Sequence, residues 1–267
     1  MRRLLPARLT PAGLVPAGLT PLGLVPFGVA AVVELVGVAT DNIVLQWLAK
    51  PLLAPLLLLW LLRSGRPRPD RLGSGRPSSS RSRSGRRFDG FALGLVFATG
   101  GDVALLLSGE PAFLVGMGLF LGAQISFIVA FTRHRRPPLP VLGGYLVLWA
   151  LANVVLWGPL GDLRLPVLGY SLALCLMAAA AAGVSARAAV GGALFLVSDL
   201  LIGVDAAGTR LPGHGLLVMS TYIAALLLLT TAWATADAPG RDEDRGRSRG
   251  AGAGKVRVAS AGDRAES

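Results

Sequence analysis

Long apolar runs, separated by short polar connections, cover most of the chain between residues 14 and 235. About 20 helical residues, each rising 1.5 Å, cross the ~30 Å hydrocarbon core of a membrane. Because that core offers no water to backbone groups, runs of this length cross it as helices. The pattern predicts an all-α integral membrane bundle of eight transmembrane helices, at residues 14–38, 45–62, 88–107, 111–131, 139–157, 165–183, 188–204 and 216–235.

The overall composition agrees with a membrane location. The chain is 53% hydrophobic and only 15% charged, and its mean hydropathy is +0.61. These values are too apolar for an ordinary water-soluble protein. We therefore expect a multi-pass protein of the cell membrane.

The arginines lie in the connections between the apolar runs. Nine of them fall between Arg63 and Arg87, and others follow the fourth, sixth and eighth runs. The connections on the opposite side hold only Arg164 and Arg210. By the positive-inside rule, this asymmetry places both termini in the cytoplasm. The net charge of +11 therefore indicates orientation, and because the arginine-rich loop has no interleaved aromatic residue, we expect no nucleic-acid partner.

Three segments fall outside the predicted spans. Residues 1–13 are rich in proline and glycine, and the repeat LTPAG LVPAG LTPLG LVPFG continues into the first span, which indicates a kinked or late-starting helix. The Arg/Ser-rich loop at 63–87 and the tail at 237–267 have the composition of disordered cytoplasmic segments. Residues 14–236 then form one membrane domain, whose first helix we expect to be retained and not cleaved as a signal peptide.

A few polar side chains interrupt the apolar runs, where an ionised group costs several kcal/mol. Counting along the spans places Asp102 and Asp199 ~21 and ~18 Å from the cytoplasmic side, and Tyr222 ~13 Å from the outer side. The predicted topology therefore brings these residues into one layer, slightly outside the membrane midplane. The polar residues of this set are Lys50, Asp102, Gln124, Asn153, Asp199 and Tyr222.

Three charged residues, Glu34, Asp41 and Lys50, lie toward the outer ends of the first two spans. We expect the two carboxylates to be solvated near the outer surface. Lys50 is more informative, because the chain has 24 arginines and only two lysines. A lysine directly before Pro51, inside a span, indicates that a compact ammonium is needed there and a planar guanidinium is not. A structural ion pair and a side chain that reaches the membrane interface are the alternatives.

Several short motifs occur in a recognisable order along the spans. They are Lys50-Pro51, Gly101-Asp102, Phe195 with Ser198-Asp199, and Tyr222. In this order they resemble the YhhN and TMEM86 lysoplasmalogenase family of eight-span membrane proteins, over about residues 27–233. The chain departs from that family at Gln124 and Phe127, where a histidine and a tyrosine are common, and at Ala225, where a glutamine is common.

The resemblance implies hydrolysis of the vinyl ether bond of a lysoplasmalogen to a fatty aldehyde and a glycerophospho-alcohol. Protonation of the alkene gives an oxocarbenium ion that water captures, so the reaction needs a proton donor, a nearby anion and a base. Two carboxylates in a dry cleft meet these needs, because like charges at short range keep one of them protonated. We expect Asp102 and Asp199 to be this catalytic pair, and which of them is the acid stays open. The candidate substrate-binding residues are Lys50, Tyr222, Gln124, Asn153 and Ser198, with Lys50 holding the lipid phosphate or fixing the charge of an aspartate.

A lysophospholipid and membrane lipid are the expected partners, and no metal or other cofactor is expected. His134 and His214 fall in loops on opposite sides, so a zinc site has no histidine ligands in the spans. The alternative function is a proton-coupled transporter or a lipid-binding membrane protein with a structural Asp/Lys network. Inverted repeats are typical of transporters, but the predicted topology makes the third and seventh spans parallel. Gln124 and Asn153 also fit plain interhelical hydrogen bonding.

Overall fold

The structure is a computed structural model that describes residues 21–64, 89–206, 208 and 212–236. The segments predicted at 1–13 and 237–267, and the loop from residue 65 to 87, lie outside the described residues. Within the described ranges the chain is all-helical, as predicted, and has no strand. The elements are η2 (Pro21–Leu24), α1 (Val25–Ala39), α2 (Ile43–Ser64), α3 (Gly90–Ala104), α4 (Glu110–His134), α5 (Leu139–Leu156), η3 (Gly161–Leu163), α6 (Arg164–Val184), α7 (Ala186–Ala206) and α8 (His214–Ala236).

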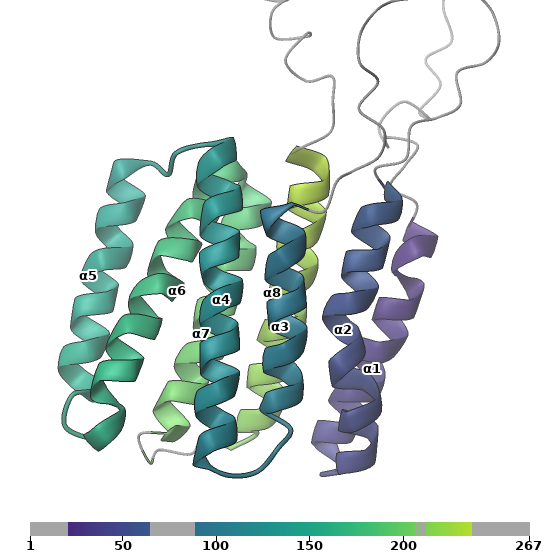
Figure 1. Cartoon of the computed structure of the whole chain (residues 1–267), viewed down its shortest axis with the longest axis horizontal. Helices are drawn as coiled ribbons and strands as arrows, with labels where there is room; N and C mark the ends of the chain where they lie inside the picture. Colours follow the sequence, from purple (N-terminus) through teal and green to yellow (C-terminus); the bar gives the residue numbers. More distant parts are fainter. Residues whose placement is uncertain (1–20, 65–88, 207, 209–211, 237–267) are drawn as a thin grey trace, which may run out of the picture.

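Successive α-helices alternate in direction and stand side by side as one bundle (Figure 1). α3 packs against α2 and α4, and α7 packs against α6 and α8. The two helices that carry the predicted catalytic aspartates, α3 and α7, run in the same direction (Figure 1). Both aspartates are therefore carried by helices with neighbours on two sides.

Seven helices of the described part of the chain are long and apolar enough to cross a membrane. The remaining apolar helix, α3, has 15 residues, or about 22 Å at the helical rise. The apolar run predicted at 88–107 is longer than α3, because its last residues form a turn and not an α-helix. The backbone nitrogens of Leu106 and Leu107 donate to carbonyl oxygens three residues earlier. α2, in contrast, extends to Ser64, so the first two residues of the loop predicted at 63–87 are helical.

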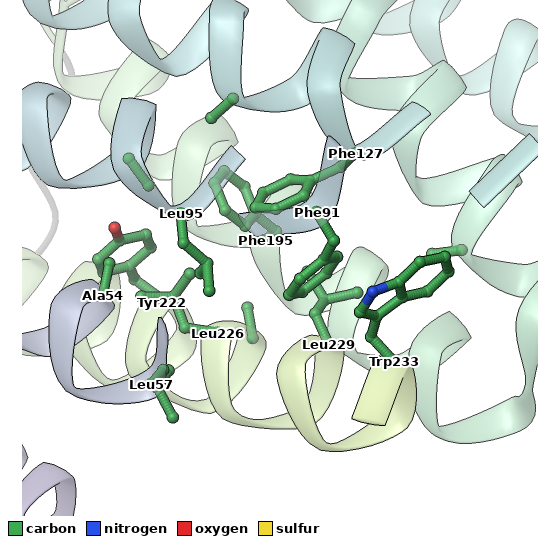
Figure 2. Packing of buried hydrophobic residues seen from close by; sticks show 14 of the residues in the cluster. Ala54, Leu57, Phe91, Leu95, Phe127, Phe195, Tyr222, Leu226, Leu229 and Trp233 are labelled. Carbon is green, nitrogen blue, oxygen red and sulfur yellow. The ribbon is translucent and has the colours of Figure 1, made fainter. Parts of the chain in front are cut away.

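Aromatic side chains fill the interior between α3, α4 and α8. The ring of Phe91 lies 4.8 Å from that of Phe127 and 5.6 Å from that of Trp233, centroid to centroid. Figure 2 shows these rings together, with Leu226 and Leu229 of α8 beside them. Such aromatic contacts hold α3 against α4 and α8.

Two adjacent glycines let α7 approach both α6 and α8 closely. A Cβ atom at Gly191 would lie 3.0 Å from the backbone nitrogen of Leu229, and one at Gly192 would lie 3.0 Å from the Cα atom of Ala178. Small residues at helix contacts are the usual means of tight packing in membrane bundles. The backbones of α6, α7 and α8 are therefore held at short range.

Asp89 fixes the beginning of α3. Its side chain accepts a hydrogen bond from the backbone nitrogen of Ala92 at 2.9 Å, as an N-cap does. The indole of Trp233 donates to the other carboxylate oxygen at 3.0 Å. This contact ties the start of α3 to the end of α8 and sets the position of α3 along α8.

Candidate functional site

Asp102 lies near the end of α3 and is 1% exposed. The hydroxyl of Tyr222 on α8 donates to its Oδ2 atom at 2.8 Å. Its Oδ1 atom is buried and has no hydrogen-bond partner. The structure therefore brings together two residues that the sequence placed in one layer, and leaves one buried carboxylate oxygen without a partner.

Tyr222 is held by two phenylalanine rings. Its ring meets those of Phe120 and Phe195 edge to face, at 5.8 and 5.6 Å between centroids. Phe120 in turn lies directly on α3, because a Cβ atom at Gly101 would be 2.7 Å from its ring. The glycine before Asp102 thus makes room for the ring that orients the partner of Asp102.

Asp199 lies on α7 and accepts hydrogen bonds from two other helices. The hydroxyl of Tyr170 on α6 donates to its Oδ2 atom. The amide of Gln124 on α4 donates to the same oxygen at 3.4 Å. Gln124 was predicted at this site, whereas Tyr170 was not. A tyrosine inside the sixth apolar run was the signal that could have found it.

The two aspartates belong to one electrostatic cluster. Asp102 interacts electrostatically with Asp199. Tyr222, which donates a hydrogen bond to Asp102, also interacts electrostatically with Asp199. The tyrosines of the two acids, Tyr170 and Tyr222, also interact with each other. The cluster thus joins α3, α4, α6, α7 and α8 in the interior of the bundle.

A vestibule of about 600 Å³ opens between α1, α2, α4, α7 and α8. It lies near the ends of α1, α3 and α7 that lead into the short connections. Lys50 lines it, as do Gln46 and His214. Lys50 also interacts electrostatically with Asp102. Lys50 is therefore one of several polar side chains in the otherwise largely apolar wall of the vestibule.

Glu34 corrects an expectation, since it was expected to be solvated near the outer surface. It is 0% exposed, and both of its carboxylate oxygens lack a hydrogen-bond partner. Counting residues predicted the position of Glu34 along the span but not the direction in which its side chain points. That direction is set by the packing of α1 on α2 and α8. Asp41, in the turn between α1 and α2, is exposed as expected.

A smaller, apolar cavity of about 100 Å³ lies between α4, α5, α6 and α7. Asp199 and Tyr170 form part of its wall, among leucines and aromatic residues. The apolar cavity and the vestibule have four lining residues in common: Leu105, Phe113, Ile202 and Ala206. Leu105 lies three residues after Asp102 and Ile202 three residues after Asp199, so each aspartate has a helical neighbour at the boundary of the two spaces.

Asn153 and Ser198 hold helices together. The amide of Asn153 donates to the carbonyl of Trp149 at 2.9 Å and to the hydroxyl of Ser171 on α6 at 3.1 Å, and Asn153 lines the apolar cavity. Ser198 is buried, and its hydroxyl donates to the carbonyl of Val218 on α8 at 3.1 Å. Binding of substrate by these two residues stays a prediction.

The two histidines, expected in loops, are helix ends: His134 is the last residue of α4 and His214 the first of α8. His134 packs its ring on Trp233, 5.7 Å away. Among the residues that the structure describes, no group of three or more His, Cys, Asp or Glu side chains is arranged to hold a metal ion.

Relatives from different organisms, all with the same name, match part of the chain. Lysoplasmalogenase TMEM86B from Homo sapiens is 32% identical over 150 residues, which cover 54% of this chain and 63% of that protein. The proteins of the same name from Sus scrofa and Rattus norvegicus are 32% and 33% identical over 135 residues, or 57% and 55% of their lengths. The matched part of the chain therefore spans less than two thirds of each relative. No solved structure matches the chain.

The family comparison covers more of the chain than the individual relatives do. Residues 45–233 match the model of the YhhN family. This stretch contains both aspartates, their tyrosines and Lys50, and it confirms the resemblance inferred from the short motifs. Because the match extends over more than half of the sequence, the chain is a member of the YhhN family.

Proposed function

We propose that this protein hydrolyses the vinyl ether bond of lysoplasmalogens, the activity in the name of its relatives. One observation carries the proposal: buried Asp102 and half-buried Asp199, each bonded to a tyrosine, lie three residues before Leu105 and Ile202, which line both the apolar cavity and the vestibule. A reaction at the junction of a lipid tail and a headgroup needs acid–base groups at such a boundary.

The two spaces suit a lipid with one chain. The apolar cavity takes the beginning of the alkenyl chain, next to Asp199. The vestibule takes the glycerophosphate headgroup, with its phosphate on Lys50. The vinyl ether group, which connects chain and glycerol, then lies between the two aspartates. A single-chain lysophospholipid is the substrate class that this arrangement supports.

The aspartates perform the chemistry as a pair. One carboxyl group donates its proton to carbon 2 of the alkene, and the positive charge that develops on carbon 1 and the ether oxygen faces the other, ionised carboxylate. That carboxylate then removes a proton from water as the water oxygen bonds to carbon 1, giving a hemiacetal. On collapse of the hemiacetal it returns this proton to the glycerol oxygen, while the first carboxylate takes the hemiacetal proton. Paired carboxylates cleave glycosidic bonds through a similar cation.

The remaining polar residues support this pair. Tyr222 orients Asp102, and Tyr170 and Gln124 orient Asp199, through the hydrogen bonds described above. Asn153 lines the apolar cavity, which supports the proposal that its amide contacts the substrate near the ether bond. Ser198 keeps α7 and α8 together, which fixes Asp199 relative to Tyr222.

A transporter or lipid-binding protein is the second candidate. The buried oxygens of Glu34 and Asp102 that lack partners favour it, since proton carriers and ligand sites use such groups. The helices α3 and α7 run parallel, which argues against a transporter built from inverted repeats (Figure 1).

For the membrane arrangement we propose that all eight helices cross the cell membrane with both termini in the cytoplasm. α3 is short, but it lies between α2 and α4, and its apolar sequence continues into the turn after Ala104. An even number of crossings puts the arginine-rich connections on one side, as the positive-inside rule requires.

The test uses the purified full chain and a lysoplasmenyl lipid, with aldehyde release as the measurement. Asp102→Asn and Asp199→Asn each lower the rate by about 100-fold or more, the usual contribution of a general acid or base. Asp162→Asn is the matched control, because Asp162 is exposed in η3 and lines neither cavity; it keeps the wild-type rate. Uptake of lipid into vesicles without aldehyde release would instead favour transport.

A further inference from the structure

The helix α5 is held to the bundle on one side only. It stands at one edge of the molecule (Figure 1) and packs on α6, with no packing of comparable extent between α5 and either α4 or α7 in the described helices. Only Asn153 of its 18 residues is buried. The indole of Trp149 donates to the carbonyl of Leu168 on α6 at 3.2 Å. Asn153 Nδ2 donates to the hydroxyl of Ser171, also on α6, at 3.1 Å.

The apolar cavity beside Asp199 reaches the outer surface of the bundle next to α5. Leu148 of α5 and Leu200 of α7 both line the cavity, yet 41% and 38% of their surfaces are exposed. Because α5 and α7 each pack on α6, α6 closes the cavity from behind, and the two leucines lie where it opens. We call this opening, between Leu148 and Leu200, the lateral mouth.

The cavity is too small for a whole lipid chain. Its volume of about 100 Å³ has room for roughly 7–10 water-sized groups, at about 10–15 Å³ each. A lipid chain that reaches from the membrane surface to the midplane spans ~15 Å, half of the ~30 Å hydrocarbon core. Everything beyond the first carbons of such a chain must therefore leave the cavity. Charged side chains line the vestibule at one end of the cavity, whereas leucines flank the lateral mouth.

We propose that the alkenyl chain of the lysophospholipid leaves the cavity through the lateral mouth, between α5 and α7, and that its distal end stays among the membrane lipids. This route rests on the function proposed above and adds to it the way in which the substrate is held. The lipid then reaches Asp199 sideways from the membrane, and its chain never enters water. Chains of different length bind alike once they fill the cavity, because the remainder contacts lipid in both the free and the bound state.

The inner end of the cavity distinguishes a substrate chain from an ordinary lipid tail. Asp199 lines the cavity and is only half-buried, and the hydroxyl of Tyr170, which donates to it, lies on the same wall. A plain hydrocarbon tail at this position would leave the exposed part of the carboxyl group without water or a polar partner, which is costly. An alkenyl chain brings its ether group to that end and fills the mouth with hydrocarbon.

Gly203 on α7 allows the cavity to be filled without a clash. It lines the cavity, and nothing lies within 4 Å of the position of its Cβ atom. Leucine suits a helix better than glycine, so Gly203→Leu is expected to keep or raise the unfolding temperature in detergent. We expect its KM for a long-chain lysoplasmenyl lipid to rise about tenfold, as for lost burial of about two methylene groups. Gly144→Leu on α5 is the control with wild-type KM, because Gly144 is exposed, equally free of neighbours and outside both cavities.

A short-chain substrate separates a filled cavity from a damaged site. A 1-propenyl lysophospholipid keeps the vinyl ether and the headgroup, but its chain ends inside the cavity. We expect the same KM for this lipid in Gly203→Leu and in the wild type. An unchanged KM for the long-chain lipid in Gly203→Leu, or an equal rise of KM for both lipids, overturns the proposed route.

Photo-cross-linking locates the chain without turnover. The probe is a 1-alkyl lysophospholipid, which has no vinyl ether to hydrolyse, with a diazirine in mid-chain, added to the purified full chain in phosphatidylcholine vesicles. Mass spectrometry is expected to find label on Leu148 and Leu200 that excess unlabelled lysoplasmenyl lipid removes, whereas label on the outward-facing Val154 of α5 persists.

Two results of this experiment overturn the route. Label on Leu148 and Leu200 that the competitor does not remove comes from bulk lipid. Absence of label on both leucines means that the chain lies elsewhere or that a second copy of the protein covers the mouth. Because the probe is not hydrolysed, the cross-links test the route even if the wild type releases no aldehyde, a result that rejects the proposed function alone.

Discussion

Tyr222 and Asp102 are joined by a 2.8 Å hydrogen bond although they lie 120 positions apart in the chain. Together with the bond from Trp233 to Asp89, it fixes α3 against α8 at two points, one near each end of α3. The bond leaves the other oxygen of Asp102 buried and without a hydrogen-bond partner. Tyr222 therefore orients the carboxyl group through one oxygen and leaves the other without a hydrogen bond, which suits the proton exchange proposed for the pair.

Removal of the Tyr222 hydroxyl tests this relationship. Tyr222→Phe keeps the ring between Phe120 and Phe195 but loses the bond to Asp102, so we expect kcat to fall about tenfold, as for the loss of one hydrogen bond to a carboxyl group. Thermal unfolding in detergent is expected to change little. Aldehyde release at the wild-type rate from folded Tyr222→Phe would show that the bond does not serve the reaction.

The two donors to Asp199 are expected to differ in importance. Gln124 Nε2 lies 3.4 Å from the accepting oxygen, at the outer limit of a hydrogen bond, so Gln124→Leu lowers kcat only a few-fold. Tyr170→Phe removes the closer donor and lowers kcat about tenfold. The kcat values of the two variants, measured with the same lipid, check this order, and a larger effect of Gln124→Leu would contradict it.

Lys50 is predicted to act on the lipid phosphate. Lys50→Met raises KM for a lysoplasmenyl phospholipid about tenfold or more, because a charge-assisted contact is lost, and leaves kcat nearly unchanged. A 1-alkenylglycerol, which has no phosphate, is the matched substrate: its KM is the same for the wild type and the variant. Equal changes of KM for both substrates would remove the phosphate from the role of Lys50.

Gly101 is predicted to be intolerant of a side chain. In Gly101→Ala the new Cβ atom collides with the ring of Phe120, which displaces Tyr222 and costs about 1–3 kcal/mol of stability, as overpacked cores do. Gly118→Ala on α4 is the control, because nothing lies within 4 Å of its Cβ position. Unfolding temperature and aldehyde release both fall in the first variant only. A normal unfolding temperature in Gly101→Ala would mean that Phe120 moves aside at no cost.

The helices could be predicted from the sequence because each helix of a membrane bundle is a continuous apolar stretch of about 20 residues. Runs of apolar residues predicted all eight α-helices, and counting along them predicted one layer for Asp102, Asp199 and Tyr222, in agreement with the hydrogen bond between Tyr222 and Asp102. The order of short motifs then indicated the family that the comparison confirmed. The position of a residue along a helix axis follows from its residue number, because each residue adds about 1.5 Å. These predictions therefore required no knowledge of side-chain contacts.

The direction in which a side chain points could not be predicted in the same way. Glu34 lies near the end of its span, as counted, but the packing of α1 turns it into the interior. Tyr170 was missed because one tyrosine in an apolar helix is compatible with both a lipid-facing and an inward position. Its contact with Asp199 depends on the close approach of α6 and α7 at Gly192, which the sequence does not reveal.

Hydrolysis of a lysoplasmenyl lipid in deuterium oxide tests the catalytic role of Asp102 and Asp199 most directly. In the proposed reaction the acid of the pair exchanges its proton with solvent before it protonates carbon 2, so the purified wild type is predicted to release aldehyde with one deuterium on carbon 2, measured by mass spectrometry after trapping. Asp102→Asn and Asp199→Asn are predicted to release about 100-fold less of this product, and Asp162→Asn the wild-type amount. Aldehyde without deuterium, or wild-type release by both aspartate variants, would contradict the account.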